Sequence, residues 1–188
     1  MIMEKRRKKH NERLLYLSGI LAVVRVLISK YLNQEISPYD IIGNIGEAVS
    51  VTLLFGWLYR KYIWRFKFVK WESMPRLYKR YSGVLKSSYD DIERPISLEI
   101  KQTLLSVEVR LISDESRSDS VNATIKEING QNTLLYTYLN EPMSAHRDHS
   151  PIHYGTAKLS ILSERELKGT YYTDRKTTGD MLLSALEE

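Results

Sequence analysis

The sequence of 188 residues contains no cysteine. This absence excludes disulfide frameworks, zinc sites built on thiolates and cysteine nucleophiles. Histidine is also scarce, and three of the four histidines, His146, His149 and His153, lie in one polar stretch around Asp148 and Pro151. A metal site needs tight geometry that a loop-like stretch does not promise. We therefore interpret this segment as a polar loop and expect no bound metal.

The motifs of common enzymes are missing as well. The sequence has no nucleophile–base arrangement, no paired carboxylates in a cleft pattern, no glycine-rich phosphate loop and no spacing of metal ligands. We therefore expect a protein that is not an enzyme and that needs no cofactor.

Positive charge is unevenly distributed along the chain. The first 70 residues contain 13 Lys and Arg against 5 Asp and Glu, a net charge of +8, whereas the remainder contains 15 against 18, a net charge of −3. The basic excess therefore flanks the apolar segments, where anionic lipid head groups explain it. Because the second part is mildly acidic, we expect no long nucleic acid as a ligand.

Two long apolar runs lie near the N-terminus, over Leu14–Leu32 and Tyr39–Tyr59. Each is close to the ~20 residues that a helix needs to cross a hydrocarbon core of ~30 Å. The segment between them, Asn33–Pro38, is short and polar, as an exposed turn between helices should be. The sequence therefore predicts a transmembrane helical hairpin over residues 14–59.

Basic residues flank this hairpin on both outer sides, at Lys5–Lys9 before it and at Arg60, Lys61 and Arg65 after it. Since positively charged flanks stay in the cytoplasm, we expect a multi-pass protein of the inner membrane with both termini cytoplasmic. The first run is too long for an ordinary cleaved signal peptide and lacks a cleavage site. The predicted organisation is a basic cytoplasmic N-terminus (1–13), the hairpin (14–59), a basic linker (60–74) and a cytoplasmic ligand-sensing domain (75–188).

Each predicted membrane helix contains one charged residue, Arg25 in the first and Glu47 in the second. Counted from the turn, both lie at nearly the same depth. A charge in mid-membrane costs at least ~2.5 kcal/mol, so an opposite charge at equal depth is the natural compensation. The pair could be a static clamp within one hairpin, or it could act in oligomerisation or in opening the bilayer.

After residue 70 the pattern changes to short alternating segments. Ile96, Leu98 and Ile100, for example, alternate with polar residues, as in a strand that buries one face. Asn129-Gly130 is a strong two-residue hairpin signal. Eight strands are predicted, at Tyr78–Ser87, Ile96–Thr103, Leu105–Ser113, Ser120–Ile128, Thr133–Asn140, His153–Leu162, Glu166–Thr173 and Thr178–Leu183.

Eight short antiparallel strands suit an up-and-down barrel, because closure removes the exposed edges of an open sheet. A barrel of this size can hold one small ligand. The predicted fold class is a membrane-anchored all-β protein, with two N-terminal transmembrane helices followed by an eight-stranded antiparallel up-and-down β-barrel.

One line of inward-facing residues near the penultimate strand combines aromatic, hydroxyl and cationic groups. Aromatic rings can stack on bases, arginine can bind a phosphate through two parallel hydrogen bonds, and threonine can bond sugar or phosphate oxygens. Each tyrosine could instead serve barrel packing, since aromatics are favoured in strands, and a turn arginine can be solvated surface. The candidate ligand-binding residues are Tyr81, Tyr136, Tyr138, Tyr171, Thr173, Arg175 and Thr177.

Short motifs along the chain also match a known family. They are Met74-Pro75 leading into Tyr81-Ser82-Gly83, the strand Leu134–Tyr138, and Leu167–Arg175 with Thr177 and Gly179. With the two membrane helices before them, the chain resembles the two-helix transmembrane β-barrel effectors of bacterial CBASS anti-phage systems. These are membrane effectors associated with CD-NTases and analogous to STING.

This resemblance implies that the barrel binds a cyclic dinucleotide made by a cognate nucleotidyltransferase during infection. Binding would promote homo-oligomerisation, and the helices would disrupt the inner membrane and abort the infection. One alternative is a membrane-tethered, lipocalin-like barrel that binds a lipid or another apolar molecule, which would need an almost wholly aliphatic interior. Another is a purely structural assembly domain.

Overall fold

The computed structural model describes residues 2–32, 37–66 and 74–186, with the backbone alone for residues 2–5. The chain divides into two compact units, Met1–Glu72 and Ser73–Glu188. Residues 33–36 of the predicted hairpin turn and residues 67–73 of the predicted basic linker 60–74 lie outside the described residues. The two units are described separately.

The first unit contains two long helices, α1 (Ile2–Tyr31) and α2 (Pro38–Lys61), and a short 3₁₀ turn, η1 (Ile63–Arg65). Within α1 the segment Arg6–Tyr31, like the whole of α2, is long and apolar enough to cross a membrane. The expected apolar helices are therefore present, and α1 also includes most of the basic N-terminal segment.

The N-terminus of α2 is fixed by a capping box. The Ser37 hydroxyl accepts from the Asp40 backbone N–H at 3.2 Å, and the Asp40 carboxylate accepts from the Ser37 N–H at 2.8 Å. This reciprocal pair satisfies two donors that a helix start otherwise leaves free. Further along α2, Gly56 packs on Leu14 of α1, where an added Cβ would collide with the leucine methyls.

The two intrahelical charges meet within one chain. Arg25 Nη2 lies 3.4 Å from a carboxylate oxygen of Glu47, and both side chains are about half exposed in the isolated chain. The count of residues from the hairpin turn therefore placed them at matching heights.

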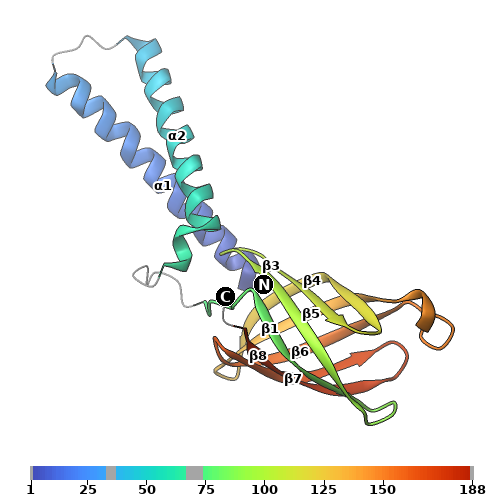
Figure 1. Cartoon of the computed structure of the whole chain (residues 1–188). Coiled ribbons are helices and arrows are strands. Elements are labelled where there is room, and N and C mark those ends of the chain that lie inside the picture. Colours follow the sequence, from blue (N-terminus) through green and yellow to red (C-terminus); the bar gives the residue numbers. More distant parts are fainter. Residues whose placement is uncertain (1, 33–36, 67–73, 187–188) are drawn as a thin grey trace. The chain divides into compact units, whose positions relative to one another are not determined.

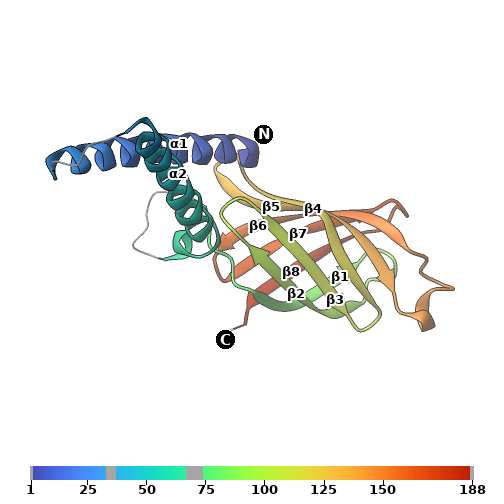
Figure 2. The same ribbon diagram turned by 90° about the horizontal axis from the view of Figure 1, so that it is seen from above.

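The second unit is a closed barrel in which each strand pairs antiparallel with its sequence neighbours and the last pairs with the first (Figures 1 and 2). This is the predicted up-and-down barrel. The strands are β1 (Arg80–Ser87), β2 (Glu93–Gln102), β3 (Val107–Ser113), β4 (Ser116–Ile128), β5 (Gln131–Pro142), β6 (His153–Ser163), β7 (Glu166–Thr173) and β8 (Thr178–Ala185).

Three strands begin earlier than the sequence predicted, and the shift is smallest in β5, which starts at Gln131 instead of Thr133. We expected β2 from Ile96 and β4 from Ser120, whereas they start at Glu93 and Ser116. At the start of β2, Pro95 pairs with β1, but pairing with β3 begins only at Ile96. Pro95 therefore lies where β2 has one neighbour, and its missing N–H is tolerated there.

The predicted hairpin between β4 and β5 is present. Asn129 and Gly130 both have positive φ, at 50° and 78°. Positive φ at both central residues is the signature of the type I′ turn, whose twist matches that of paired strands.

Apolar side chains fill the half of the barrel where β1 begins and β8 ends. Leu98, Leu134, Leu159, Leu167 and Leu183 are fully buried there. The chain entering the barrel closes this end, since Leu77 is also buried and its N–H donates to the Gln102 side chain at 2.9 Å. Any opening into the barrel must therefore lie at the opposite end.

Candidate ligand-binding cavity

A cavity of about 240 Å³ occupies the end of the barrel opposite the closed one. Its lining comes from the last residues of the odd-numbered strands and the first residues of the even-numbered ones, with the loops that join them. The loop between β5 and β6, which contains a short 3₁₀ turn at Ser144–His146, forms part of its mouth.

Six of the seven predicted ligand-binding residues line this one cavity. They come from three places far apart in the sequence: strand β5, strand β7 and the turn between β7 and β8. The six are Tyr136, Tyr138, Tyr171, Thr173, Arg175 and Thr177.

Tyr81, the seventh, does not line the cavity but lies at the closed end, fully buried. Its hydroxyl donates to the Glu164 carbonyl at 2.6 Å and accepts from the Tyr78 N–H at 3.0 Å. Burial raises the pKa of this phenol to about 12. Tyr81 thus joins the entering chain to the turn between β6 and β7, which is a structural role.

Two stacked levels of aromatic side chain line one wall. Tyr136 and Tyr138 lie on the same face of β5, with ring centroids 5.8 Å apart. Tyr138 lies over Gly155 of β6, where an added Cβ would collide with its ring. Burial raises the pKa of both phenols, so both are neutral hydrogen-bond donors at physiological pH.

The hydroxyl of Tyr136 is fully buried, and no donor or acceptor of the described residues bonds to it. A buried polar group without a partner costs about 1–3 kcal/mol, so such groups are rare and call for an explanation. Here the residue that carries the group lines a cavity, which makes the hydroxyl a candidate donor to a bound ligand.

Strand β7 and the turn that follows it bring a third ring and two hydroxyls to the cavity. Tyr171 lies over Gly179 of β8, where a side chain would collide with its ring. The hydroxyls of Thr173 and Thr177 lie 2.7 Å apart across the turn, and Thr173 also accepts from the Thr177 N–H. The turn is therefore closed on itself and holds the residues between the threonines in place.

Arg175 extends from this turn toward the cavity mouth. Its guanidinium donates to the Ser150 hydroxyl at 2.9 Å and to the His149 carbonyl at 3.3 Å. Both acceptors are uncharged, and within the described part of the chain no carboxylate pairs with this arginine. Its positive charge is therefore uncompensated at a cavity wall.

A second arginine, which the sequence analysis did not select, lines the other side. Both terminal nitrogens of Arg94 donate to the Asp90 carboxylate, at 3.0 and 2.5 Å, and its Nε donates to Glu115 at 3.3 Å. The paired guanidinium lowers the pKa of Asp90 to about 2. Arg94 continues the alternation of Ile96 and Leu98, a signal that extending β2 past Pro95 would have found.

Hydroxyl and amide groups complete the lining between these charges. The Asn140 side-chain amide donates to the hydroxyls of Ser116 and Ser118, both at 2.9 Å. The Ser116 hydroxyl in turn lies 3.3 Å from that of Ser113. These groups were not selected from the sequence, because single serines in a strand pattern do not distinguish an interior position from a surface one.

The three histidines of the predicted polar loop, 146, 149 and 153, all lie at the cavity. The first two are in the loop between β5 and β6, and His153 begins β6. Among the described residues, no cluster of three His, Asp or Glu is arranged to hold a metal ion. The His153 ring nitrogen Nδ1 lies 2.9 Å from the Pro151 carbonyl, which fixes the ring at the mouth.

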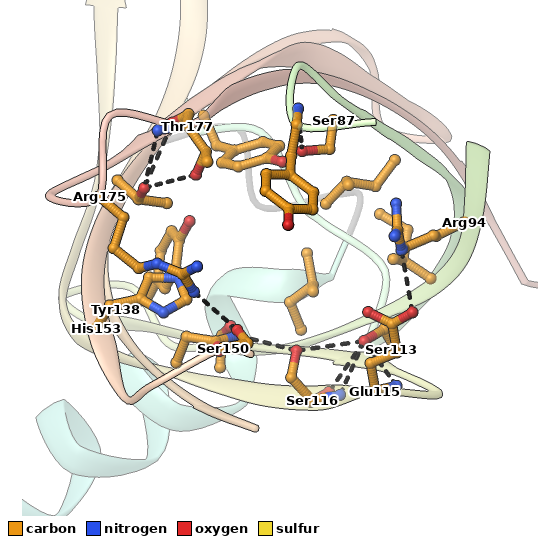
Figure 3. Close-up of a pocket in the computed structure, with 18 of the residues that line it drawn as sticks. Ser87, Arg94, Ser113, Glu115, Ser116, Tyr138, Ser150, His153, Arg175 and Thr177 are labelled. Carbon is orange, nitrogen blue, oxygen red and sulfur yellow. Dashed lines mark hydrogen bonds and ion pairs between the residues drawn. The ribbon is translucent and has the colours of Figure 1, made fainter. Parts of the chain in front are cut away.

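The cavity thus combines four tyrosines, which are Tyr89 and the three described above, with several hydroxyls and with two arginines on opposite walls (Figure 3). Rings offer stacking surfaces, and a free guanidinium binds phosphate through parallel hydrogen bonds. These groups suit a ligand that carries both aromatic rings and negative charge. Leu85, Ile96, Leu111 and Met181 add apolar surface, but the lining is not almost wholly aliphatic, as a site for an aliphatic chain would be.

Comparison with known proteins agrees with this chemistry. Residues 73–185, which form the barrel unit, match the family model described as "Cap15, cyclic dinucleotide receptor domain". The chain belongs to this family. Its barrel is therefore a cyclic dinucleotide receptor domain, and the resemblance to CBASS effectors is confirmed.

A curated relative extends the similarity to the helices. The chain is 31% identical over 176 residues to CD-NTase-associated protein 15 of Staphylococcus schleiferi. The matched region covers 93% of this chain and 96% of that protein, so it includes both the helical unit and the barrel.

Proposed function

We propose that this chain is a membrane-anchored CBASS effector whose barrel cavity binds a cyclic dinucleotide from a cognate nucleotidyltransferase. Binding leads to homo-oligomerisation and to disruption of the inner membrane, which aborts phage infection. The observation that carries the proposal is the gathering of Tyr136, Tyr138, Tyr171 and Arg175 around one cavity. No catalytic step is part of it.

In this proposal the bases stack on tyrosine rings and a phosphate binds Arg175. Arg175 is the better phosphate ligand of the two arginines, because its partners are a hydroxyl and a carbonyl, whereas Arg94 is held by two carboxylates. The hydroxyls of Thr173 and Thr177 lie beside it and can bond sugar or phosphate oxygens. The unpartnered hydroxyl of Tyr136 donates to an acceptor of the ligand.

The size of the cavity suggests how binding leads to assembly. At about 240 Å³ it is smaller than the 300–1,000 Å³ typical of pockets that enclose a drug-sized ligand. A ligand of two nucleotides is larger than most such ligands, so part of it remains at the mouth. An exposed nucleotide offers a second copy of the chain a surface absent from the free protein. A ligand that binds the assembled form better shifts the equilibrium toward it.

The helices would serve as the membrane-active part. In our proposal α1 and α2 cross the inner membrane with both chain termini in the cytoplasm, and assembly gathers many copies of the Arg25–Glu47 pair in one patch of bilayer. Charges at that depth are costly unless paired or hydrated, so their accumulation favours water entry and bilayer disruption.

Binding is tested by calorimetry on the full chain in detergent with a panel of cyclic dinucleotides. Tyr171→Ala should weaken binding about 5- to 150-fold, because stacking on one ring contributes about 1–3 kcal/mol per base. Tyr172→Ala, on the outer face of the same strand, is the matched control and should leave affinity unchanged. Equal affinity of both variants would place the ligand elsewhere.

The phosphate contact has its own pair of variants. Arg175→Ala should weaken binding at least tenfold, since a hydrogen bond to a charged group contributes about 1.5–3 kcal/mol. Lys168→Ala removes a positive charge from the exposed face of β7 and serves as control. Loss of affinity in both variants alike would indicate long-range attraction rather than a specific contact.

Assembly and membrane disruption need a separate readout. Light scattering of the detergent-solubilised chain should show larger particles on adding the nucleotide that binds, and vesicles containing the chain should release a trapped dye. Particles of constant size with and without nucleotide would favour the purely structural assembly domain. Fatty acid binding in place of nucleotide binding would favour the lipocalin-like alternative, which the charged cavity lining opposes.

A further inference from the structure

The two sides of the cavity differ in charge, because Arg175 has no carboxylate partner among the described residues, whereas Arg94 lies in a cluster with Glu115 and with Asp90, which is outside the cavity lining. Figure 3 shows Arg175 and His153 on one wall and Arg94 with Glu115 on the other. Arg94 is paired with both Asp90 and Glu115, so that cluster has a net charge of −1. A carboxylate in a cavity for an anionic ligand repels phosphate, and its presence there needs a reason.

The ion pair of Glu115 with Arg94 contributes little to the stability of the barrel. The Asp90 carboxylate already binds Arg94 through two hydrogen bonds, whereas Glu115 adds a single one at 3.3 Å. The Glu115 carboxylate is about half exposed, and exposed ion pairs contribute little to stability. Its second oxygen, Oε2, has no partner among the residues that the structure describes.

The backbone nevertheless fixes Glu115 firmly at the rim. Its N–H donates to the Ser113 hydroxyl at 3.3 Å, and its carbonyl accepts from the Met143 N–H at 2.9 Å. Arg94 Nε then holds one carboxylate oxygen from the side. The result is a positioned acceptor with one free oxygen, in the cavity that is also lined by Tyr136, whose buried hydroxyl bonds to none of the described residues.

An ionised carboxylate only accepts hydrogen bonds, so it can recognise only a base edge that presents hydrogen-bond donors. Guanine presents two adjacent donors, N1–H and the N2 amine, which match the two carboxylate oxygens. Adenine and cytosine place a ring acceptor beside their amine, and uracil flanks its one N–H with two carbonyls. When both carboxylate oxygens face the Watson–Crick edge, each of these bases therefore sets an acceptor against one of them, which is repulsive.

Resting on the proposed function, we infer that Glu115 selects a ligand that contains at least one guanine. Glu115 binds the Watson–Crick edge of that base while Arg175, on the opposite wall, binds phosphate. Arg94 is then a positioning residue, which orients the carboxylate. The chain should accordingly discriminate among cyclic dinucleotides by base rather than bind all of them alike.

The test measures affinities of the full chain in detergent for cyclic di-GMP, cyclic GMP–AMP, cyclic di-AMP and cyclic di-UMP. We expect at least one guanine-containing ligand to bind about tenfold or more tightly than either ligand without guanine. An analogue with hypoxanthine in place of guanine, which lacks the N2 amine, should lose a similar factor.

Glu115→Gln separates base reading from simple electrostatics. Removing a negative charge near phosphates should, by charge alone, raise the affinity for every cyclic dinucleotide. Base reading predicts instead that this variant loses about tenfold for the guanine ligand alone and no longer distinguishes guanine from hypoxanthine. Asp114→Asn, which removes the same charge from the exposed neighbouring position outside the cavity lining, is the control.

Each result has one meaning, provided that thermal melts show both variants folded. Loss confined to the guanine ligand in Glu115→Gln supports the inference. Tight binding of cyclic di-AMP or cyclic di-UMP by the unmodified chain, or an unchanged guanine preference in Glu115→Gln, would overturn it while leaving the proposed function intact. Failure of every cyclic dinucleotide to bind would overturn the proposed function and the inference with it.

Discussion

Tyr136 and Tyr81 are both buried in the barrel, but replacing each by Phe should change the free energy of unfolding in opposite directions. The Tyr136 hydroxyl is buried and bonds to none of the described residues, whereas the Tyr81 hydroxyl has two partners, the Glu164 carbonyl and the Tyr78 N–H. Tyr136→Phe therefore removes a buried hydroxyl whose desolvation is not offset by a hydrogen bond to the described residues. Tyr81→Phe instead leaves the Glu164 carbonyl and the Tyr78 N–H without the hydrogen bonds that they make to the phenol.

The magnitudes follow from these partners. An unsatisfied buried hydroxyl costs about 1–3 kcal/mol, so Tyr136→Phe should raise the free energy of unfolding by about 1 kcal/mol, equivalent to a rise in Tm of about 4 °C. Tyr81→Phe should lower it by about 1–3 kcal/mol. In addition, Tyr136→Phe should weaken nucleotide binding about fivefold, because one neutral hydrogen bond contributes about 1 kcal/mol.

The assay is thermal unfolding of the full chain in detergent, followed by the circular dichroism of the barrel, with calorimetric binding on the same samples. The combination of higher stability and lower affinity in Tyr136→Phe is the diagnostic result. If Tyr136→Phe destabilised the barrel as much as Tyr81→Phe does, its hydroxyl would have a partner in the free protein, and the reasoning would be refuted.

Three further predictions concern packing, charge and pH. Gly155→Ala should force the Tyr138 ring toward the cavity, so calorimetry should show weaker nucleotide binding, and unchanged affinity would mean that the ring is not part of the site. Arg25→Leu leaves Glu47 unpaired at a cost of at least about 2.5 kcal/mol in the bilayer, so the yield of membrane-inserted protein should fall. The double variant Arg25→Glu with Glu47→Arg keeps the pair and should restore the yield. An unchanged yield in Arg25→Leu would show that the pair does not matter for insertion. Burial raises the pKa of Tyr81 from 10.0 to about 12, so on raising the pH the unfolded chain loses this proton before the folded chain does. The free energy of unfolding should therefore fall as pH rises from about 10 to about 12. The same pH dependence in Tyr81→Phe would assign the loss to other groups.

The fold could be predicted because each element has a local signal. Period-two alternation identifies a strand that buries one face, and Asn129-Gly130 identifies its hairpin. The height of Arg25 and Glu47 in their helices follows from counting residues, since the rise of a helix is constant. The start of β2 was missed because Pro95 normally marks the end of pairing, and only the absence of a second neighbour there makes it acceptable.

The site was only partly predictable, because alternation gives the face of a residue but not its depth in the barrel. Tyr81 and Tyr171 both face inward, yet pairing registers place one at the closed end and the other at the cavity. Arg94 and Glu115 come together only when β2 lies beside β3. Such proximity depends on the tertiary structure and has no signal in the spacing of the residues along the chain.

The most direct test of the central claim is an experimental structure of the full chain with the cyclic dinucleotide that binds it. We expect the ligand in the barrel cavity, with a phosphate against Arg175, a base against one of the cavity tyrosines and part of the nucleotide emerging at the mouth. A nucleotide bound on the outer wall of the barrel, with the cavity unchanged, would contradict the account.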